Sequence, residues 1–400
     1  MENNSIASDI YLNISSEAPT HDRPPGGSVT DQPLYSAGIT AMLWGLPHII
    51  TLGTIGNIFS FIVMLQREMR QTSTFFYLAV LAVADTIVLF VSAFKTWIRT
   101  ATGFEMLHVS DLSCKTFMFL TYFSLHLSAW LIVAVTIERF IVVWFPLKAT
   151  TICSTRRAKL TTLAVAGSLA ILNCHLFWTA ELVQDLKTGR TVCAMLQTNQ
   201  FLYKEVMPWL HFTIYCLLPF ILLMTFNALI ILSLIRHRQM ITSQMTRNDK
   251  RSRYNHRKLA ITLLSVSFVW IATNIPSALY TVIPLHPTTA QQAASQFFIK
   301  ILCYLFLYLN HAINFLLYCI TGQAFRREFA KLICCTCRKK RQPKRRLQFR
   351  ASRTGSVHDT TTPLMNSGRV SHTPIITIPL KQRQGSSSSK EIGRLRLYLV

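Results

Sequence analysis

Charge is scarce in this sequence of 400 residues, and negative charge is scarcest. Charged residues make up 14% of the chain, whereas about 25% is usual in soluble proteins. There are 17 Asp and Glu residues against 41 Lys and Arg residues, while hydrophobic residues make up 50% of the chain. This composition argues against a soluble globular domain and favours a membrane protein.

The formal net charge of +24 does not predict a nucleic-acid partner. The basic residues are concentrated in short segments and in the tail, between long apolar runs. In membrane proteins such basic segments mark the loops that stay in the cytoplasm. We therefore expect membrane lipids, and not nucleic acid, to lie beside this charge.

The sequence also lacks the patterns that a transporter or a membrane enzyme would need. No internal repeat is present, which argues against a transporter built from inverted halves. Asp85 alone is clearly a charged group at mid-membrane depth, whereas a transporter or channel would use several. Paired carboxylates and a nucleophile–base arrangement are both missing. Four histidines are isolated on different apolar runs, which suits a packing role better than catalysis; they are His126, His175, His211 and His311. We therefore predict that the chain is not an enzyme and keep a transporter as the weaker alternative.

Seven apolar runs are each close to the length of about 20 residues that crosses a bilayer. They extend over residues 40–65, 72–98, 112–145, 160–178, 206–235, 259–284 and 296–320. The joining segments are alternately basic and acidic or uncharged, which predicts an extracellular N-terminus and a cytoplasmic C-terminus. The expected fold is an all-α membrane protein, a seven-helix transmembrane bundle over residues 40–320 in the plasma membrane.

The two ends of the chain are polar. Residues 1–39 are rich in acids, and we interpret them as a disordered extracellular segment with glycosylation sequons at Asn3 and Asn13. Residues 338–400 are basic and rich in Ser and Thr, which predicts a disordered cytoplasmic tail. Phosphorylation of this tail would create a binding site for arrestin, and its last residues also fit a PDZ domain.

Residues 321–337 follow the last apolar run. Their Phe and Leu residues recur at helical spacing with charges opposite, which predicts an amphipathic helix lying on the inner membrane surface. Three cysteines close this segment and indicate palmitoylation: Cys334, Cys335 and Cys337. A zinc site is the alternative, but no further His or Cys pair completes its four ligands.

Short motifs recur at set places in the apolar runs. The third run has Cys114 at its outer end and Glu138-Arg139-Phe140 at its inner end, with Pro146 seven residues after the arginine. Other positions carry part of the same pattern: Asn57, Asp85, Pro219, Pro276, Asn314 and Tyr318. Together these motifs resemble those of rhodopsin-like (class A) G protein-coupled receptors, whose third helix carries Asp-Arg-Tyr where this chain has Glu-Arg-Phe.

The resemblance implies a disulfide and a buried polar core. The disulfide would join Cys114 to Cys193, which lies in the loop after the fourth run. In the polar core a sodium ion would bind, with Asp85 and Ser128 as its oxygen ligands; no other cofactor is implied. The core would comprise Asn57, Asp85, Ser128 and Asn314.

The resemblance also implies coupling to a heterotrimeric G protein, of the Gq or Gi/o class. Arg139 would be held beside Glu138 at rest and would meet the G protein on activation, while Leu147 would offer it an apolar contact. Because the sixth run begins without an acid that could hold Arg139, we expect measurable basal signalling. The residues expected in activation and coupling are Glu138, Arg139, Phe140, Leu147, Pro276 and Tyr318.

Three positions depart from the family pattern. Phe315 replaces the usual proline of the seventh helix, which predicts a straighter inner end. Asn274 replaces the usual tryptophan of the sixth helix, so a polar switch would replace the aromatic one. Asn227 replaces the usual tyrosine of the fifth helix.

Thr121 replaces the aspartate that amine-binding members of the family carry, which argues against an amine ligand. The loop between the fourth and fifth runs contains a Thr188-Gly189-Arg190 turn between two candidate strands, as in peptide-binding members. The motif variants look most like invertebrate neuropeptide receptors of the FMRFamide-receptor type. A lipid or an odorant is the alternative ligand.

The outer ends of the second and seventh runs carry cations. Lys95, Arg99 and Lys300 would contact an acidic residue, carboxylate or C-terminal amide of a peptide, while Glu181 and Asp185 would contact its basic part. Alternatively, these cations would extend to lipid headgroups. The remaining expected ligand-binding residues are Thr121, Tyr122, His211, Tyr215, Asn274, Tyr304 and Tyr308.

Overall fold

The computed structural model describes residues 28–184, 191–195, 206–239, 247–282 and 287–338. The chain divides into two units, Met1–Gln342 and Pro343–Val400, and every described residue lies in the first. Seven helical spans of this unit are long and apolar enough to cross a membrane. The predicted all-α bundle of seven spans is therefore confirmed.

Several spans are made of more than one helical element. Their bounds are, for the first span, α1 (Pro33–Met64); for the second, α2 (Ser73–Val88), η2 (Leu89–Phe94) and α3 (Lys95–Thr102); for the third, α4 (Asp111–Trp144); for the fourth, α6 (Thr155–Asn173) and α7 (Leu176–Thr179); for the fifth, α8 (Met207–Phe212), η6 (Thr213–Leu217) and α9 (Leu218–Gln239); for the sixth, α10 (Arg247–Val282); and for the seventh, α11 (Ala290–Ala312) and α12 (Asn314–Thr321). The shorter elements are η1 (Val29–Asp31), η3 (Met106–His108), α5 (Pro146–Ile152), β1 (Ala180–Gln184), β2 (Thr191–Met195) and α13 (Gln323–Arg338).

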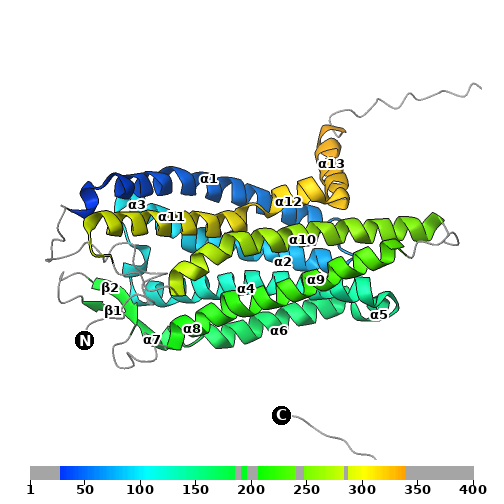
Figure 1. Cartoon of the computed structure of the whole chain (residues 1–400), viewed down its shortest axis with the longest axis horizontal. Helices are drawn as coiled ribbons and strands as arrows, with labels where there is room; N and C mark the ends of the chain where they lie inside the picture. The colour runs from blue at the N-terminus through cyan, green and yellow to red at the C-terminus, as the bar shows by residue number, and fades with distance from the viewer. Residues whose placement is uncertain (1–27, 185–190, 196–205, 240–246, 283–286, 339–400) are drawn as a thin grey trace, which may run out of the picture. The chain divides into compact units, whose positions relative to one another are not determined.

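The helices run side by side, and short elements cover the two ends of the bundle (Figure 1). The strands β1 and β2 lie at one end, called here the hairpin end, and α5 and α13 lie at the other, called the α13 end. The strands pair antiparallel, with Leu182 opposite Cys193, which confirms the predicted hairpin. A disulfide joins Cys193 to Cys114 in the first turn of α4, so the hairpin is fixed to the third span.

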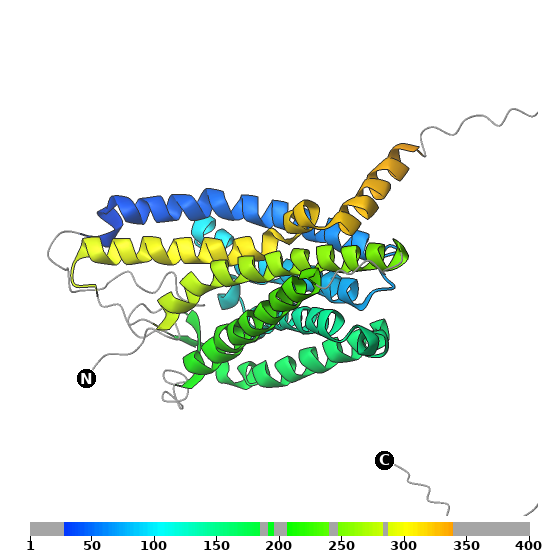
Figure 2. The ribbon, with the colours of Figure 1, turned by 45° about the vertical axis from the view of Figure 1, so that its right-hand side comes forward.

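Helix α4 is the central element of the bundle and packs against α2, α6, α9 and α10. Its start is well defined, because the Ser110 hydroxyl accepts a hydrogen bond from the Ser113 amide at 3.1 Å and Asp111 stands in the positively polarised first turn. It ends at Trp144, because Pro146 disfavours a helical conformation at Phe145. Helices α1 and α11 pack together on another side, as the two views show (Figures 1 and 2).

The first span begins earlier than predicted. Helix α1 starts at Pro33, so residues 33–39, which we expected in the disordered N-terminal segment, are helical. Proline suits the first turn of a helix because its fixed φ fits and its missing N–H would have had no partner there. The rest of that predicted segment that lies before Ser28 is outside the described residues.

The inner part of the seventh span is interrupted, although no proline is present. Helix α11 ends at Ala312 and α12 begins at Asn314, so the prediction of a straighter inner end is wrong. The amide of Asn57 donates to the carbonyl of His311 at 3.0 Å. In a continuous helix that carbonyl would accept the amide of Phe315. The side chain from α1 thus takes over part of the role that the missing proline would have had.

Two spans contain a wide π turn near the hairpin end, η2 in the second and η6 in the fifth. Each is bonded to a neighbouring span: the Ser92 hydroxyl is 2.9 Å from the Tyr308 hydroxyl, and the Trp130 indole donates to the Ile214 carbonyl at 3.0 Å. An extra residue in a turn rotates everything beyond it by about 100°. The directions of Lys95 and Arg99 therefore differ from those expected of a regular helix.

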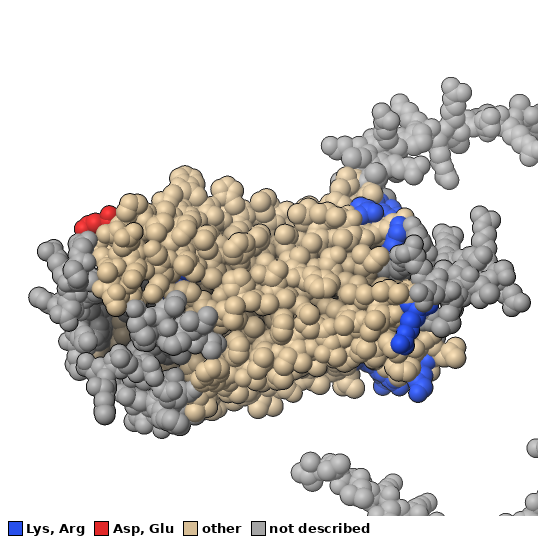
Figure 3. Space-filling model, viewed as in Figure 1, with Lys and Arg blue, Asp and Glu red and all other residues tan. Residues whose placement is uncertain are grey.

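Exposed cations are confined to one end of the described bundle (Figure 3). Among the described side chains, every exposed Lys and Arg lies at the α13 end: Arg67, Arg70, Lys148, Arg156, Arg157, Lys159, Arg236, Arg326, Arg327 and Lys331. The four described cations near the hairpin end are buried or half-buried: Lys95, Arg99, Lys115 and Lys300.

Candidate functional site

Lys95 begins α3 and is buried, with 8% of its surface exposed. No hydrogen bond or ion pair joins its ammonium group to another residue in the described part of the chain. Burying a charge in this way is costly unless a counter-charge reaches it. The side chain lies within the bundle and not at its lipid-facing surface, which does not fit the alternative that it extends to headgroups.

Arg99, one turn further along α3, forms an ion pair with Glu105. The two side chains are close because the chain reverses at Gly103, whose φ of 72° lies in the left-handed region that favours glycine. Glu105 was not among the predicted site residues, yet it balances a predicted ligand-binding cation. Of the two acids that we predicted to contact the ligand, Glu181 lies in β1 and Asp185 lies outside the described residues.

The third and fifth spans meet through a row of rings. The ring of Tyr122 stacks on that of His211 at 4.1 Å, and His211 Nδ1 lies 3.5 Å from His126 Nε2. The Asn173 amide lies 3.2 Å from the other nitrogen of His126, which links the row to the fourth span. Tyr122 and His211 were predicted site residues and are brought together. His126 and Asn173 were not, and their contact connects spans that no sequence spacing could relate.

Thr121 of the third span and Tyr304 and Tyr308 of the seventh are buried. The Thr121 hydroxyl is buried and has no hydrogen-bond partner in the described structure. The rings of Tyr304 and Tyr308 stack at 6.4 Å, and Tyr308 is anchored to η2 through Ser92. Lys300 is half-buried two turns before Tyr308 on the same helix.

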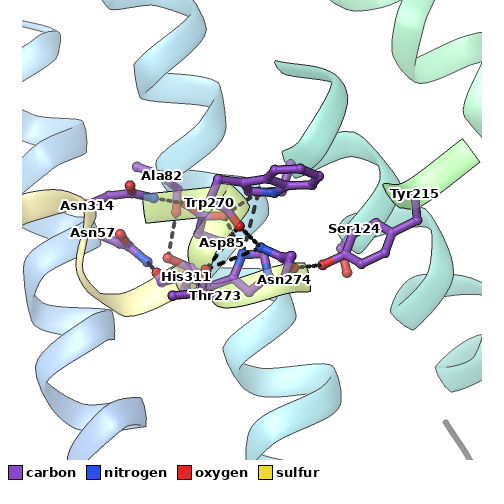
Figure 4. A network of polar contacts seen from close by, with 12 residues as sticks. Asn57, Ala82, Asp85, Ser124, Tyr215, Trp270, Thr273, Asn274, His311 and Asn314 are labelled. Carbon is purple, nitrogen blue, oxygen red and sulfur yellow. Dashed lines mark hydrogen bonds and ion pairs between the residues drawn. The ribbon is translucent and has the colours of Figure 1, made fainter. Parts of the chain in front are cut away.

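Asn274, in the place of the family's tryptophan, is hydrogen-bonded on both sides (Figure 4). Its Oδ1 accepts from the Tyr215 hydroxyl at 2.7 Å, and its Nδ2 donates to the Trp270 carbonyl at 2.8 Å. Trp270 is fully buried one turn away and meets the ring of Tyr215 edge-on at 6.2 Å. The predicted site residues Tyr215 and Asn274 are thus joined directly, and Trp270, which was not predicted, packs against them.

The predicted polar core is assembled around Asp85 (Figure 4). The Ser128 hydroxyl donates to Asp85 Oδ1 at 2.7 Å, and the Asn314 amide donates to Oδ2 at 2.7 Å. The core contains one residue that we did not predict: His311 Nδ1 is 2.8 Å from Asp85 Oδ1. Asn57 reaches this group through its bond to the His311 carbonyl at 3.0 Å.

At the α13 end, Glu138 and Arg139 form a buried pair. Arg139 Nη2 is 2.9 Å from Glu138 Oε1, and the two residues are 3% and 7% exposed, respectively. The Thr74 hydroxyl donates to the same carboxylate oxygen at 2.6 Å. This burial distinguishes the pair from a solvated ion pair at a helix end, which contributes little. Thr74 was not predicted.

The other residues predicted for activation and coupling lie on four different helices. Phe140 packs against Phe226 of α9, with ring centroids 5.1 Å apart, and Pro276 lies inside α10. Tyr318 is buried, and its hydroxyl has no hydrogen-bond partner among the described residues. Leu147, in contrast, is 89% exposed on α5.

Helix α13 is attached to the first loop of the bundle by charge. Lys331 lies 3.0 Å from Glu68 and 2.8 Å from Glu328, and Arg327 approaches both acids. The hydrogen bond from Lys331 is the main cause of a lowered pKa at Glu68. The predicted palmitoylation residues Cys334, Cys335 and Cys337 fall in the last turns of α13, and their side chains are outside the described residues, as are Asn3 and Asn13.

The comparison with known protein families matches this arrangement. The sequence model of the family described as 7 transmembrane receptor (rhodopsin family) matches residues 56–318, from Gly56 in α1 to Tyr318 in α12. The chain belongs to the rhodopsin family. It is therefore a G protein-coupled receptor with seven membrane spans, and not an enzyme.

Individual relatives are distant but cover most of the chain. The receptor is 27% identical to the thyrotropin-releasing hormone receptor of Gallus gallus over 73% of its own length and 78% of that protein. It is 26% identical to a probable G-protein coupled receptor of Caenorhabditis elegans, over 75% of its length and 71% of that protein. It is 23% identical to the growth hormone secretagogue receptor type 1 of Sus scrofa, over 74% of its length and 81% of that protein.

Proposed function

We propose that this receptor binds an extracellular peptide at the hairpin end and passes the signal to a heterotrimeric G protein at the α13 end. The observation that carries the proposal is Lys95, a buried cation without an ion-pair partner in the described structure. A peptide that brings an acidic residue, a C-terminal carboxylate or a C-terminal amide carbonyl to Lys95 would satisfy this group. Lys300 and the anchored tyrosines of α11 would contact the rest of the peptide.

The proposed orientation rests on charge and on the disulfide. Exposed Lys and Arg residues gather at the α13 end, and such residues favour the cytoplasmic side of a membrane. The Cys114–Cys193 disulfide lies at the hairpin end, and disulfides persist on the oxidising, extracellular side. Both observations support a hairpin that lies outside the plasma membrane.

A peptide suits the hairpin end better than a small amine. Thr121 offers no charge for an amine, while Lys95 favours a negative or carbonyl group. The relatives include receptors named for a releasing hormone and for a growth hormone secretagogue, which supports a hormone-like messenger for this chain as well. Within this proposal, the likeness to invertebrate FMRFamide-type receptors is the finer assignment, with a lipid or an odorant as the alternative.

Nucleotide exchange tests the proposal directly. Purified receptor is mixed with Gq or Gi/o heterotrimers and screened with synthetic peptides that end in a carboxylate or an amide. We expect some peptides to accelerate nucleotide exchange with the unmodified receptor and to be much weaker with Lys95→Met, which keeps the apolar stem and removes the charge. Acceleration by lipids alone, with no peptide active, would contradict a peptide ligand.

The buried contact of Thr74 with Glu138 predicts how the resting state is held. Thr74→Val removes a hydrogen bond to a charged group, typically worth about 1.5–3 kcal/mol, from the carboxylate that fixes Arg139. We therefore expect basal nucleotide exchange to rise several-fold at equal surface expression. Thr86→Val is the matched control, because the one hydrogen bond of the Thr86 hydroxyl among the described residues stays within its own helix, to the Ala82 carbonyl. Equal basal exchange in the two variants would contradict this role for Thr74.

Leu147 is proposed as an apolar contact for the G protein. Leu147→Asp places a charge on this exposed side chain and should reduce agonist-driven exchange about tenfold or more, because it would bury a charge in an apolar interface. Thr151→Asp adds the same charge one turn later on α5, at another exposed position, and should change exchange little. The role is wrong if Leu147→Asp couples as well as Thr151→Asp.

The proposed partners of the tail fall outside the described residues. Arrestin binding after phosphorylation and PDZ binding at Tyr398-Leu399-Val400 rest on the sequence of the tail. Palmitoylation at the end of α13 would anchor that helix to the membrane beside its cations.

A further inference from the structure

The family resemblance implies a sodium ion bound at Asp85. A hard cation of this kind prefers a cage of oxygen atoms. In this receptor the groups nearest the carboxylate are donors: the Ser128 hydroxyl, the Asn314 amide nitrogen and His311 Nδ1. Three short contacts, of 2.7, 2.7 and 2.8 Å, already engage both carboxylate oxygens.

His311 occupies the position that decides whether an ion fits. Its Nδ1 lies 2.8 Å from Asp85 Oδ1 and 3.5 Å from Ser128 Oγ, so it stands beside the two oxygens that a cation would share. An N–H group in this place is not a ligand for a cation. The residues present therefore do not fit a sodium ion.

The imidazole is also fixed in this place. It is completely buried, and the main chain that carries it is bonded to Asn57 of α1 at 3.0 Å. Its Nε2 has no hydrogen-bond partner in the described structure, so Nδ1 is the ring nitrogen that faces the carboxylate.

We propose that His311 replaces the sodium ion in this receptor and makes it insensitive to sodium. Hydrogen bonds from Ser128, His311 and Asn314 stabilise the charged carboxylate in place of a bound cation. The imidazole contacts Asp85 of the second span and Ser128 of the third, while the main-chain carbonyl of His311 accepts from Asn57 of the first, so this one residue of the seventh span joins four spans. The resting bundle is then stabilised by a side chain of the receptor itself, which is present whatever the salt concentration outside the cell.

Thermal unfolding of purified receptor, followed by tryptophan fluorescence, tests this without any ligand. NaCl is exchanged for choline chloride at constant ionic strength, with sodium raised to about 150 mM. We expect the unmodified receptor to have the same melting temperature in both salts. His311→Ser removes the ring and supplies a hydroxyl oxygen, so its melting temperature should rise by about 2–5 °C with saturating sodium.

Two further variants control the experiment. His126→Ser removes another buried histidine, one that contacts Asn173 and His211 and not Asp85 in the described structure, and should stay insensitive to sodium. His311→Ser combined with Asp85→Asn should lose the sodium response again. A saturable, sodium-specific stabilisation of the unmodified receptor would overturn the proposal, and so would a folded His311→Ser receptor that ignores sodium. If the variant does not fold, the measurement on the unmodified receptor still tests whether the receptor is insensitive to sodium. The outcome of that measurement does not depend on the nature of the agonist.

Discussion

Replacing Cys114 with alanine is expected to remove most of the receptor from the cell surface. The disulfide joins the first turn of α4 to β2 across 79 residues, so it fixes the hairpin to the central helix of the bundle. Loss of a native disulfide typically costs about 2–5 kcal/mol, a large share of the about 5–15 kcal/mol that stabilises a folded protein. Surface expression and the melting temperature of purified receptor measure the effect.

The alanine variants of the two partners test whether one bond is responsible. Cys193→Ala should match Cys114→Ala, and the double variant should be no worse than either, because all three lack the same bond. Cys303→Ala is the matched control, since Cys303 is buried but free, and should keep most of the surface expression. If Cys114→Ala is expressed as well as Cys303→Ala, the disulfide does not have this structural role.

The spans and the disulfide were predictable for different reasons. Crossing a bilayer requires length and low polarity, and both are properties of a continuous run of residues. The limits of a span were harder to predict, because a single residue can set them. Helix α1 begins as early as Pro33 because proline is favourable in the first turn of a helix, although polar residues lie around it. The disulfide was predicted from the family resemblance and not from composition.

The partners of the buried charges were harder to predict, because they depend on local irregularities of the backbone. A regular helix placed Arg99 about 40° from Asp85 in projection, but the wide turn η2 lies between them. The pairing of Arg99 with Glu105 requires the reversal at Gly103. A glycine between two opposite charges was a usable signal for this pair.

Residues that contact across the bundle gave the weakest signal. His311 looked isolated in the sequence, since its partners Asp85 and Ser128 are on other spans. The interruption at Ile313 depends on Asn57, which lies more than 250 positions earlier in the chain. The absence of a proline therefore indicated a straighter helix, and a solitary histidine indicated a packing role. The true conformation of the helix and the true role of the histidine depend on neighbours that only the fold brings together.

Lys95 is the residue at which an alanine substitution should weaken a peptide agonist most. Because the buried ammonium group has no ion-pair partner in the described bundle, an acidic or carbonyl group of the ligand would be its main counter-charge. A charge-assisted hydrogen bond of this kind is typically worth about 1.5–3 kcal/mol, which corresponds to roughly a 10- to 100-fold loss of potency. Dose–response curves of nucleotide exchange with a peptide agonist measure the loss.

The neighbouring cations provide the comparison that separates ligand contact from a general effect of charge. Arg99→Ala should reduce potency less than Lys95→Ala, because Glu105 already balances the charge of Arg99. Lys115→Ala is the matched control: Lys115 also lies near the hairpin end, but it pairs with Asp111 on the surface of α4. Lys95→Met should be as weak as Lys95→Ala, because it keeps the apolar stem and lacks only the charge. If the curve of Lys95→Met overlies that of Lys115→Ala, the ammonium group does not bind the agonist and its role is confined to packing within the bundle.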